Sequence, residues 1–189
     1  MNAPFTPRSG LGRDLRALRT QRGLTLETVA GQLGRSVGWL SQVERGISHP
    51  GFDDLQAVAQ LLGVPLSLFF GAADAPAREA GRIVRAEARR TIGERDAGLS
   101  ESLLSPDLTD SFEMVHSTFA PRAERQEHVT RPTQEVAYMV DGRLDLWIGE
   151  EHFTVAEGDS FRIRGEAFRW ANPYPKPAIA VWVISPPVY

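Results

Sequence analysis

Apolar residues in the first seventy positions recur at spacings of three and four, the period of an amphipathic helix. Leu11, Leu15 and Leu18 form one such stripe. Thr25 and Ser36 are suited to cap the next two helices, because their hydroxyls can accept hydrogen bonds from free backbone N–H groups. The pattern predicts five helices, which begin near Leu11, Thr25, Ser36, Phe52 and Pro65 and end at Gly23, Gly34, Gly46, Gly63 and Phe69. The buried positions expected in the second and third helices are Val29, Ala30, Leu33, Leu40 and Val43.

The pattern changes after residue 71. Apolar residues there alternate with polar ones or form short runs rich in Val, Ile, Phe and Trp, which is typical of strands. Turn residues, such as those of Asp141-Gly142, separate the runs. Candidate strands span residues 82–86, 101–104, 112–119, 136–140, 143–148, 152–155, 160–164 and 179–184. Many short strands at regular spacing predict a β-sandwich or barrel.

The sign of the net charge changes at the same place as the hydrophobic pattern. The whole chain has a formal net charge of -3, but residues 1–70 carry seven arginines against five acids, and residues 71–189 carry 14 bases against 19 acids. The net charge of the whole chain is therefore the sum of a basic first segment, which is suited to bind nucleic acid, and an acidic second segment. Gly, Ala and Pro are frequent in residues 71–81, which predicts a linker. We expect a flexible tail over residues 1–9 and two domains, residues 10–70 and 82–189.

Composition limits the classes of protein further. The 189 residues contain no cysteine, which excludes disulfides, zinc–thiolate sites and a cysteine nucleophile. The first residues lack the apolar core of a signal peptide, and no apolar run reaches the length of a membrane span. We therefore expect a cytoplasmic protein with no membrane partner.

Residues 25–46 predict two short helices joined by a tight turn, the unit that places one helix in the DNA major groove. With its flanking helices, over roughly residues 10–70, this segment resembles the lambda-repressor-like, XRE-type helix-turn-helix family. The run GWLSQVERGISHPGFDDLQAVAQLLGVPLSLFF carries the resemblance. The resemblance implies a five-helix DNA-binding domain with its recognition helix over residues 36–45.

The recognition helix implied by this resemblance offers modest base-reading chemistry. Gln42 can pair with an adenine edge, and Val37 can contact a thymine methyl group. The expected DNA-contacting residues are Arg35, Ser36, Val37, Gly38, Trp39, Ser41, Gln42 and Arg45. Trp39 fits surface packing and contact with the DNA backbone about equally well. Glu44 is instead expected to form an internal salt bridge or a helix cap, for example with an arginine of the first helix, because carboxylates repel phosphates.

Residues 124–172 resemble the cupin family of small β-barrels, which implies a double-stranded β-helix with a ligand pocket. In the first family motif, His128 and Glu135 match two ligand positions, whereas Thr130 stands where a second histidine belongs. In the second motif, Phe168 or Arg169 occupies the histidine position. Two donors are too few for a mononuclear metal site, so we expect no metal and no cofactor.

A pocket without metal favours a small organic ligand. The expected ligand-binding residues are His128, Glu135, Tyr138, Arg164, Phe168 and Arg169. Trp147, Trp170 and Trp182 are candidate walls, although core or dimer-interface positions suit tryptophan better. No triad or phosphate-binding glycine loop indicates catalysis.

The favoured function is a sequence-specific transcriptional regulator, a repressor, that binds a double-stranded DNA operator as a homodimer. A small-molecule effector in the barrel would control it. The alternative is a cupin-type metal-dependent enzyme tethered to DNA. A DNA-binding antitoxin is less favoured, because the second half of the chain is predicted to fold on its own.

Overall fold

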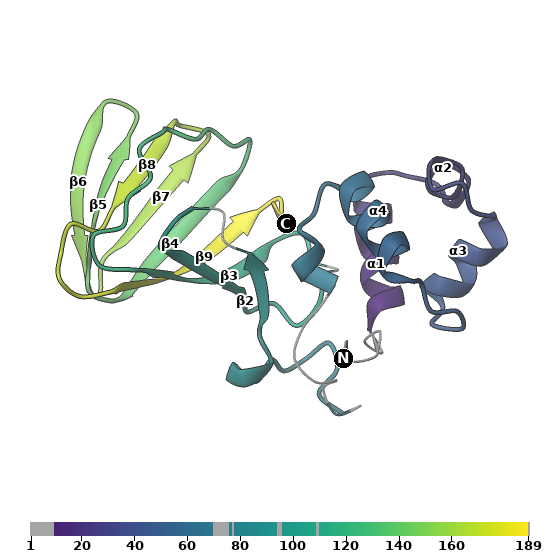
Figure 1. Ribbon diagram of the computed structural model, residues 1–189. Coiled ribbons are helices and arrows are strands. Elements are labelled where there is room, and N and C mark those ends of the chain that lie inside the picture. The colour runs from purple at the N-terminus through teal and green to yellow at the C-terminus, as the bar shows by residue number, and fades with distance from the viewer. Residues whose placement is uncertain (1–9, 70–75, 77, 94–95, 109, 189) are drawn as a thin grey trace. The chain divides into compact units, whose positions relative to one another are not determined.

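A computed structural model describes residues 10–69, 76, 78–93, 96–108 and 110–188 (Figure 1). The chain forms two compact units: a helical unit up to Arg90 with residues 106–109, and a β unit of residues 91–105 and 110–188. The predicted tail, residues 1–9, lies outside the described residues, as do 71–75 and 77 of the predicted linker.

The helical unit contains four α-helices among its described residues. They are α1 (Leu11–Gln21), α2 (Leu26–Gln32), α3 (Val37–Glu44) and α4 (Phe52–Leu62), followed by the 3₁₀-helices η1 (Leu66–Phe69) and η2 (Ala86–Ala88). The fifth predicted helix, from Pro65 to Phe69, is not an α-helix but a 3₁₀ turn, because it closes an i→i+3 bond, from Leu68 N–H to the Pro65 carbonyl, at 3.0 Å.

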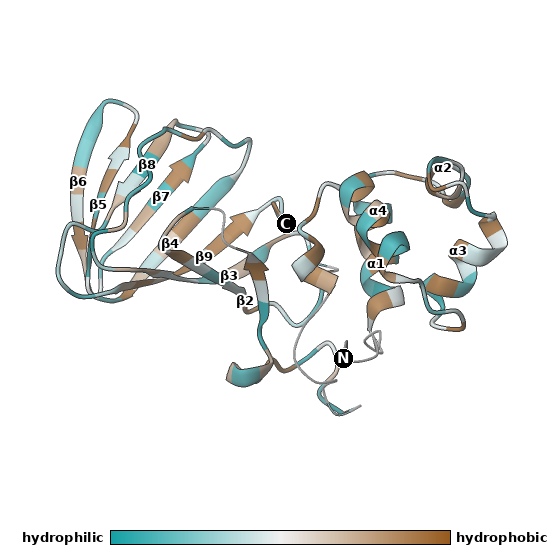
Figure 2. Ribbon diagram, in the orientation of Figure 1, coloured by the Kyte–Doolittle hydropathy of each residue, from teal (hydrophilic) through white to brown (hydrophobic). Residues whose placement is uncertain are grey.

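The apolar stripes of these helices form the core of the helical unit, and brown and teal positions accordingly alternate along them in Figure 2. Of the predicted core positions, Leu33 is half-buried and packs against a cluster formed by Val29, Ala30 and Leu40. The fully buried residues of the unit include Leu11, Leu15, Leu18, Leu40, Val43, Leu55, Leu62 and Leu68. Burial on this scale, at roughly 25 cal/mol per Å² of apolar surface, is the main stabilising contribution.

The helical unit extends past the predicted linker. A buried ion pair joins Asp14 of α1 to Arg90 at 3.1 Å, and Arg85 donates two hydrogen bonds to the Glu79 carboxylate. The Arg85 guanidinium lowers the pKa of Glu79. These contacts place residues 79–90 with the helices, whereas the sequence places the domain boundary at residue 82.

The β unit consists of two sheets. The six-stranded sheet has the order β1-β2-β3-β9-β4-β7, and the three-stranded sheet has the order β6-β5-β8. The strands are β1 (Arg90–Gly93), β2 (Leu99–Leu103), β3 (Glu113–Phe119), β4 (Gln134–Asp141), β5 (Arg143–Ile148), β6 (Glu151–Ala156), β7 (Ser160–Arg164), β8 (Phe168–Ala171) and β9 (Ala178–Ser185).

The two sheets share a core but do not close into one barrel. Phe119 of β3 meets Trp170 of β8 edge to face, with ring centroids 4.8 Å apart, so side chains of the two sheets interlock. No named strand pairs one sheet with the other within the described residues. The closed barrel expected from the cupin resemblance is therefore corrected to two sheets packed around a common core.

Strand alternation decides which side chains enter this core. Along β9, Ala180, Trp182 and Ile184 are buried, whereas Val183 between them is exposed. The Asp141-Gly142 turn joins β4 to β5 as predicted, and Gly142 has φ +79°. A Cβ atom there would lie 2.5 Å from the Pro177 carbonyl oxygen, so only glycine fits without displacement of the backbone.

Strand prediction failed in three places. Residues 82–86 form no strand, because the apolar pair Ile83-Val84 is all that the segment offers for burial. Strand β1 was missed, because its four residues include a single large apolar side chain, that of Ile92. Strand β8 was missed, because its four residues lie in a segment interpreted only as a ligand motif.

Candidate DNA-reading helix and ligand cavity

Helix α3 follows α2 through a turn of a few residues. The Ser36 hydroxyl accepts a hydrogen bond from the Trp39 N–H at 3.1 Å, and Thr25 caps α2 in the same way through the Thr28 N–H, also at 3.1 Å. Both predicted caps are thereby confirmed. Gly34 takes φ +62° in the turn, a left-handed conformation that glycine adopts without steric cost.

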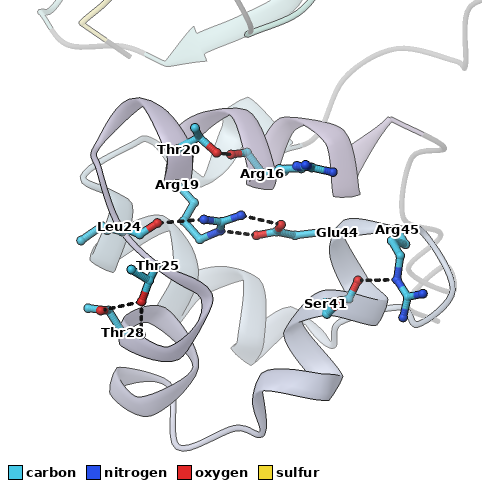
Figure 3. A network of polar contacts seen from close by, with 9 residues as sticks. All are labelled: Arg16, Arg19, Thr20, Leu24, Thr25, Thr28, Ser41, Glu44 and Arg45. Carbon is cyan, nitrogen blue, oxygen red and sulfur yellow. Dashed lines mark hydrogen bonds and ion pairs between the residues drawn. The ribbon is translucent and has the colours of Figure 1, made fainter.

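The inner face of α3 is fixed by packing and by one ion pair. Leu40 and Val43 are buried. Arg19 of α1 points at Glu44 in Figure 3, and its Nε and Nη2 donate to the two carboxylate oxygens at 2.6 and 2.9 Å. This confirms the predicted salt bridge to the first helix. The Glu44 carboxylate also raises the pKa of Arg19, so the guanidinium stays charged.

Backbone contact between α1 and α3 is close at Gly12. A Cβ atom built there would lie 2.4 Å from the Val43 carbonyl oxygen and 2.6 Å from that of Glu44. Only a residue without a side chain allows α1 to approach the end of α3 in this way. The position of α3 therefore depends on Gly12, which the sequence analysis did not single out.

Among the expected DNA-contacting residues, Val37, Gly38 and Gln42 are exposed on α3, and so is Arg45, which directly follows the helix; Ser41 is half-buried. Gln42 Oε1 accepts a hydrogen bond from the Ser48 hydroxyl at 2.8 Å, which orients its amide. Arg45 Nε donates to the Ser41 carbonyl at 3.2 Å, which holds the guanidinium beside the helix end (Figure 3).

Arg35, just before α3, lies beside Trp39 of that helix. The Arg35 guanidinium forms an ion pair with Asp54 of α4 at 2.8 Å and stands 5.3 Å from the centre of the Trp39 ring. Trp39 is half-buried and packs against the core cluster around Val29. Arg35 therefore already has a partner within the protein, and it can bind a DNA phosphate only if it releases Asp54.

The β unit contains a cavity of about 320 Å³, its opening to solvent included. About 30 Å³ of it is space that a water-sized group can occupy. Both sheets contribute to its walls, together with the loop that precedes β4. The lining residues are Leu99, Glu101, Phe119, Arg125, Arg131, Glu135, Phe168, Trp170, Trp182 and Ile184.

Two of the six predicted ligand-binding residues, Glu135 and Phe168, line this cavity. Tyr138 is exposed on the opposite face of β4, because it differs from Glu135 by an odd number of positions. Arg164 and His128 are exposed as well. Arg169 lies outside the lining and places its guanidinium 3.4 Å from the centre of the Trp147 ring.

Of the three tryptophans considered as walls, Trp170 and Trp182 line the cavity, whereas Trp147 does not. Three charged lining residues, Glu101, Arg125 and Arg131, were not predicted from the sequence. Strand alternation could have placed Glu101 beside Leu99 and Leu103, but the two arginines lie outside the named strands, where no period applies.

The charged lining residues differ in how far they are neutralised. Arg125 is paired with Asp96, with an Nε–Oδ2 distance of 2.9 Å. Arg131 is 3.7 Å from Glu135, a loose ion pair, and Glu135 also accepts a hydrogen bond from Thr133 at 2.7 Å. The cavity is therefore polar on part of its surface and aromatic on the rest.

The donor set for a cupin-type metal is incomplete. Glu135 lines the cavity, but His128 is exposed and outside the lining, and Thr130 replaces the other histidine of the motif. Within the described parts of the chain, no three His, Asp or Glu side chains are placed to hold a metal ion. The residues present do not fit the metal of this fold family.

None of the helices in the described ranges is both long and apolar enough to span a membrane.

Comparisons with known proteins assign both units. Residues 10–69 match the family model of a helix-turn-helix domain, and residues 115–184 match that of a cupin domain. The HTH-type transcriptional regulator PuuR of Escherichia coli strain K12 is 24% identical over 155 residues, 80% of this chain and 81% of PuuR. The immunity repressor protein of Bacillus phage phi105 is 27% identical over 128 residues, 67% of this chain and 88% of the repressor.

A solved structure, the HTH_3 family transcriptional regulator from Vibrio cholerae, has 21% identity and a TM-score of 0.44, with 95% of this chain and 97% of that chain covered. The chain thus combines a helix-turn-helix domain with a cupin domain, and the relatives PuuR and the phage phi105 repressor are transcriptional regulators. This chain is a helix-turn-helix transcriptional regulator of the XRE type with a C-terminal cupin domain.

Proposed function

We propose that the protein is a cytoplasmic, sequence-specific repressor that reads a double-stranded DNA operator with α3. The observation that carries this proposal is the division of α3 into two faces. Leu40 and Val43 are buried, whereas Val37, Gly38 and Gln42 are exposed. A helix presented in this way can enter the major groove, about 12 Å wide, with its exposed side chains against the base edges.

The exposed side chains of α3 divide into base and phosphate contacts. Gln42 keeps its NH₂ group as a donor, and its Oε1 retains acceptor capacity beside the Ser48 hydroxyl, which suits the two hydrogen-bonding atoms of an adenine edge. Arg45, at the end of α3, is suited to a phosphate, which adds affinity without sequence preference. The small Gly38 allows close approach of the helix backbone to the DNA.

Replacing Gln42 by alanine tests the base contact. We expect the variant to lose about 1–3 kcal/mol of affinity for the preferred sequence and little for random DNA. Arg45→Ala serves as the matched control, since it should weaken both kinds of DNA alike and reduce the salt dependence of binding. Titration of labelled duplexes at several salt concentrations measures both effects; full affinity in both variants would contradict the assignment of α3.

We further propose that the regulator is a homodimer joined through the outer face of the six-stranded sheet. Val136, Tyr138 and Val140 of β4 are 48%, 52% and 44% exposed, and Val183 of β9, the register partner of Val136, is 41% exposed. A twofold dimer brings the same surface of two chains together, so one apolar face suffices to build the interface. Two recognition helices per dimer would also double the number of base contacts.

Charge placed on this face tests the dimer. Val136→Lys is expected to halve the mass measured by sedimentation velocity at micromolar concentration, because an unpaired ammonium group would be buried. Phe153→Lys is the control, since Phe153 is also exposed, at 43%, but lies on β6 of the other sheet. A native chain that is monomeric, or a Val136→Lys chain that stays dimeric, would reject this interface.

The cavity of the β unit supports control by a small molecule. Aromatic walls combined with a few charged groups are typical of ligand sites, and the incomplete metal donor set disfavours the alternative, a metal-dependent enzyme tethered to DNA. A ligand changes DNA affinity only to the extent that it binds one state of the protein better than the other.

A further inference from the structure

The segment that follows α3 turns back onto the helix at Gln42. Gly46 has φ +71°, a left-handed conformation, and its N–H donates to the Val43 carbonyl at 2.9 Å. The Ile47 N–H donates to the Gln42 carbonyl at 2.8 Å, and these two bonds together form a Schellman motif. The reversal brings Ser48 beside Gln42, where the Ser48 N–H donates to the same carbonyl at 3.3 Å.

Ser48 contacts the side chain of Gln42 as well as its backbone. The Ser48 hydroxyl donates to Gln42 Oε1 at 2.8 Å. Ser48 is half-buried, and Pro50, two positions further on, is buried, so the segment that carries the hydroxyl is anchored to the helical unit. Gln42 itself is exposed, and the hydrogen bond therefore fixes which end of its amide lies against the protein.

The packing that usually fastens a Schellman motif is weak at this helix end. In this motif an apolar residue after the left-handed glycine commonly packs against the third residue from the end of the helix. Those two positions are Ile47 and Gln42, and Ile47 is 62% exposed whereas Gln42 is polar. The side-chain bond from Ser48 thus joins the segment to α3 where apolar packing contributes little.

A glutamine amide can read DNA in two ways, because its two ends differ. Its oxygen can accept from the adenine N6 amino group while its NH₂ group donates to N7, whereas the NH₂ group alone can donate to the acceptors of guanine or thymine. A glutamine that turns freely about its last bond presents either end. Glutamine also loses much rotamer freedom when it is immobilised, so an amide that is ordered before binding reads bases more selectively and binds at a lower entropic cost.

We propose that Ser48 is a positioning residue for base recognition. It holds the Gln42 amide so that the NH₂ group is directed to adenine N7, and Oε1, which has two lone pairs, accepts from the Ser48 hydroxyl and from adenine N6 together. This inference rests on the proposal that α3 reads DNA. Ser48 then controls which base is preferred without contacting a base itself, and the reading surface includes the segment after α3.

The base preference at one position of the DNA site tests this role. Duplexes that the full native chain selects from a random pool, compared with those selected by the Gln42→Ala chain, identify the position that Gln42 reads. Four duplexes that differ only in that base pair are then titrated with each chain. Ser48→Ala should reduce the preference for adenine over guanine roughly threefold to tenfold, the usual effect of one hydrogen bond. Ser48→Thr keeps the hydroxyl and should retain the native preference.

Two other roles for Ser48 lead to different results. If its hydroxyl only stabilised the end of α3, or bound a DNA phosphate, its removal would weaken binding to all four duplexes by the same factor. Unchanged relative affinities in the Ser48→Ala chain, with an unfolding temperature near that of the native chain, would therefore overturn the proposal. A Ser48→Thr chain that behaves like Ser48→Ala, or a native chain that prefers another base to adenine at this position, would also overturn it.

The double variant separates this inference from the proposed function. In the Gln42→Ala chain, Ser48→Ala should change the relative affinities no further, because the amide that Ser48 positions is gone. A further change would show that Ser48 acts on DNA by itself; the positioning role would then fail, while base reading by α3 would stand. If the native and Gln42→Ala chains show the same preference at every position, the proposed function fails and the role of Ser48 fails with it.

Discussion

Replacement of Gly12 by alanine is expected to destabilise the helical unit by about 1–3 kcal/mol, the usual cost of forcing extra atoms into a packed site. The new Cβ atom would stand 2.4 Å from the Val43 carbonyl oxygen and 2.6 Å from that of Glu44. These are backbone atoms of α3 and cannot rotate away, so α1 and α3 must move apart. Amide hydrogen exchange in α1 and α3 measures the loss directly.

Gly31 provides the matched control for Gly12. It is also a glycine in a helix, α2, but a Cβ atom there meets no atom within 4 Å. Gly31→Ala should therefore stabilise the unit by about 0.5–1 kcal/mol, because alanine loses less backbone entropy in a helix than glycine does. Equal exchange rates in the Gly12→Ala and native chains would show that α1 and α3 are not held in close contact.

The second large effect is expected when the Arg19–Glu44 pair loses one partner. The Arg19 and Glu44 side chains are 13% and 6% exposed, and two hydrogen bonds join them. Glu44→Ala should cost about 3 kcal/mol, because it leaves a largely buried guanidinium without its counter-charge. Denaturant unfolding followed through the helical signal gives the loss.

A double-mutant cycle identifies the cause. Replacing both partners, by Arg19→Met together with Glu44→Ala, removes the uncompensated charge and should cost less than Glu44→Ala alone, although the bond from Arg19 to the Leu24 carbonyl at 2.8 Å is also lost. If the double variant is destabilised by the sum of the two single variants, the pair contributes no coupling and α3 is positioned by packing alone.

The helices of the helical unit could be predicted from the sequence, because the signals that define them are local. The caps at Thr25 and Ser36 and the buried stripe of Leu11, Leu15 and Leu18 follow from short-range spacing, and the structure confirms them. The partner of Glu44 could be anticipated because an acid in a DNA-facing helix needs an internal cation. Gly12 could not be recognised, because its role depends on the approach of two helices that are far apart in the sequence.

The cavity was less predictable, for a physical reason. Strand alternation fixes which residues point inward, but the register between strands decides which of them meet. Glu135 and Phe168 could be proposed from family motifs, whereas the placement of Glu101 and Trp182 in one cavity depends on the pairing of β2, β3 and β9. The two lining arginines lie in irregular segments, where no sequence period indicates direction.

The measurement closest to the central claim, that α3 reads DNA sequence, is the sequencing of duplexes that the full chain retains from a random pool. The native chain should enrich a twofold-symmetric site whose half-sites lie about 10 base pairs, or a multiple of that, apart. The Gln42→Ala chain should lose preference at one position in each half-site. Enrichment of no sequence, or of the same sequence by both chains, would contradict the claim.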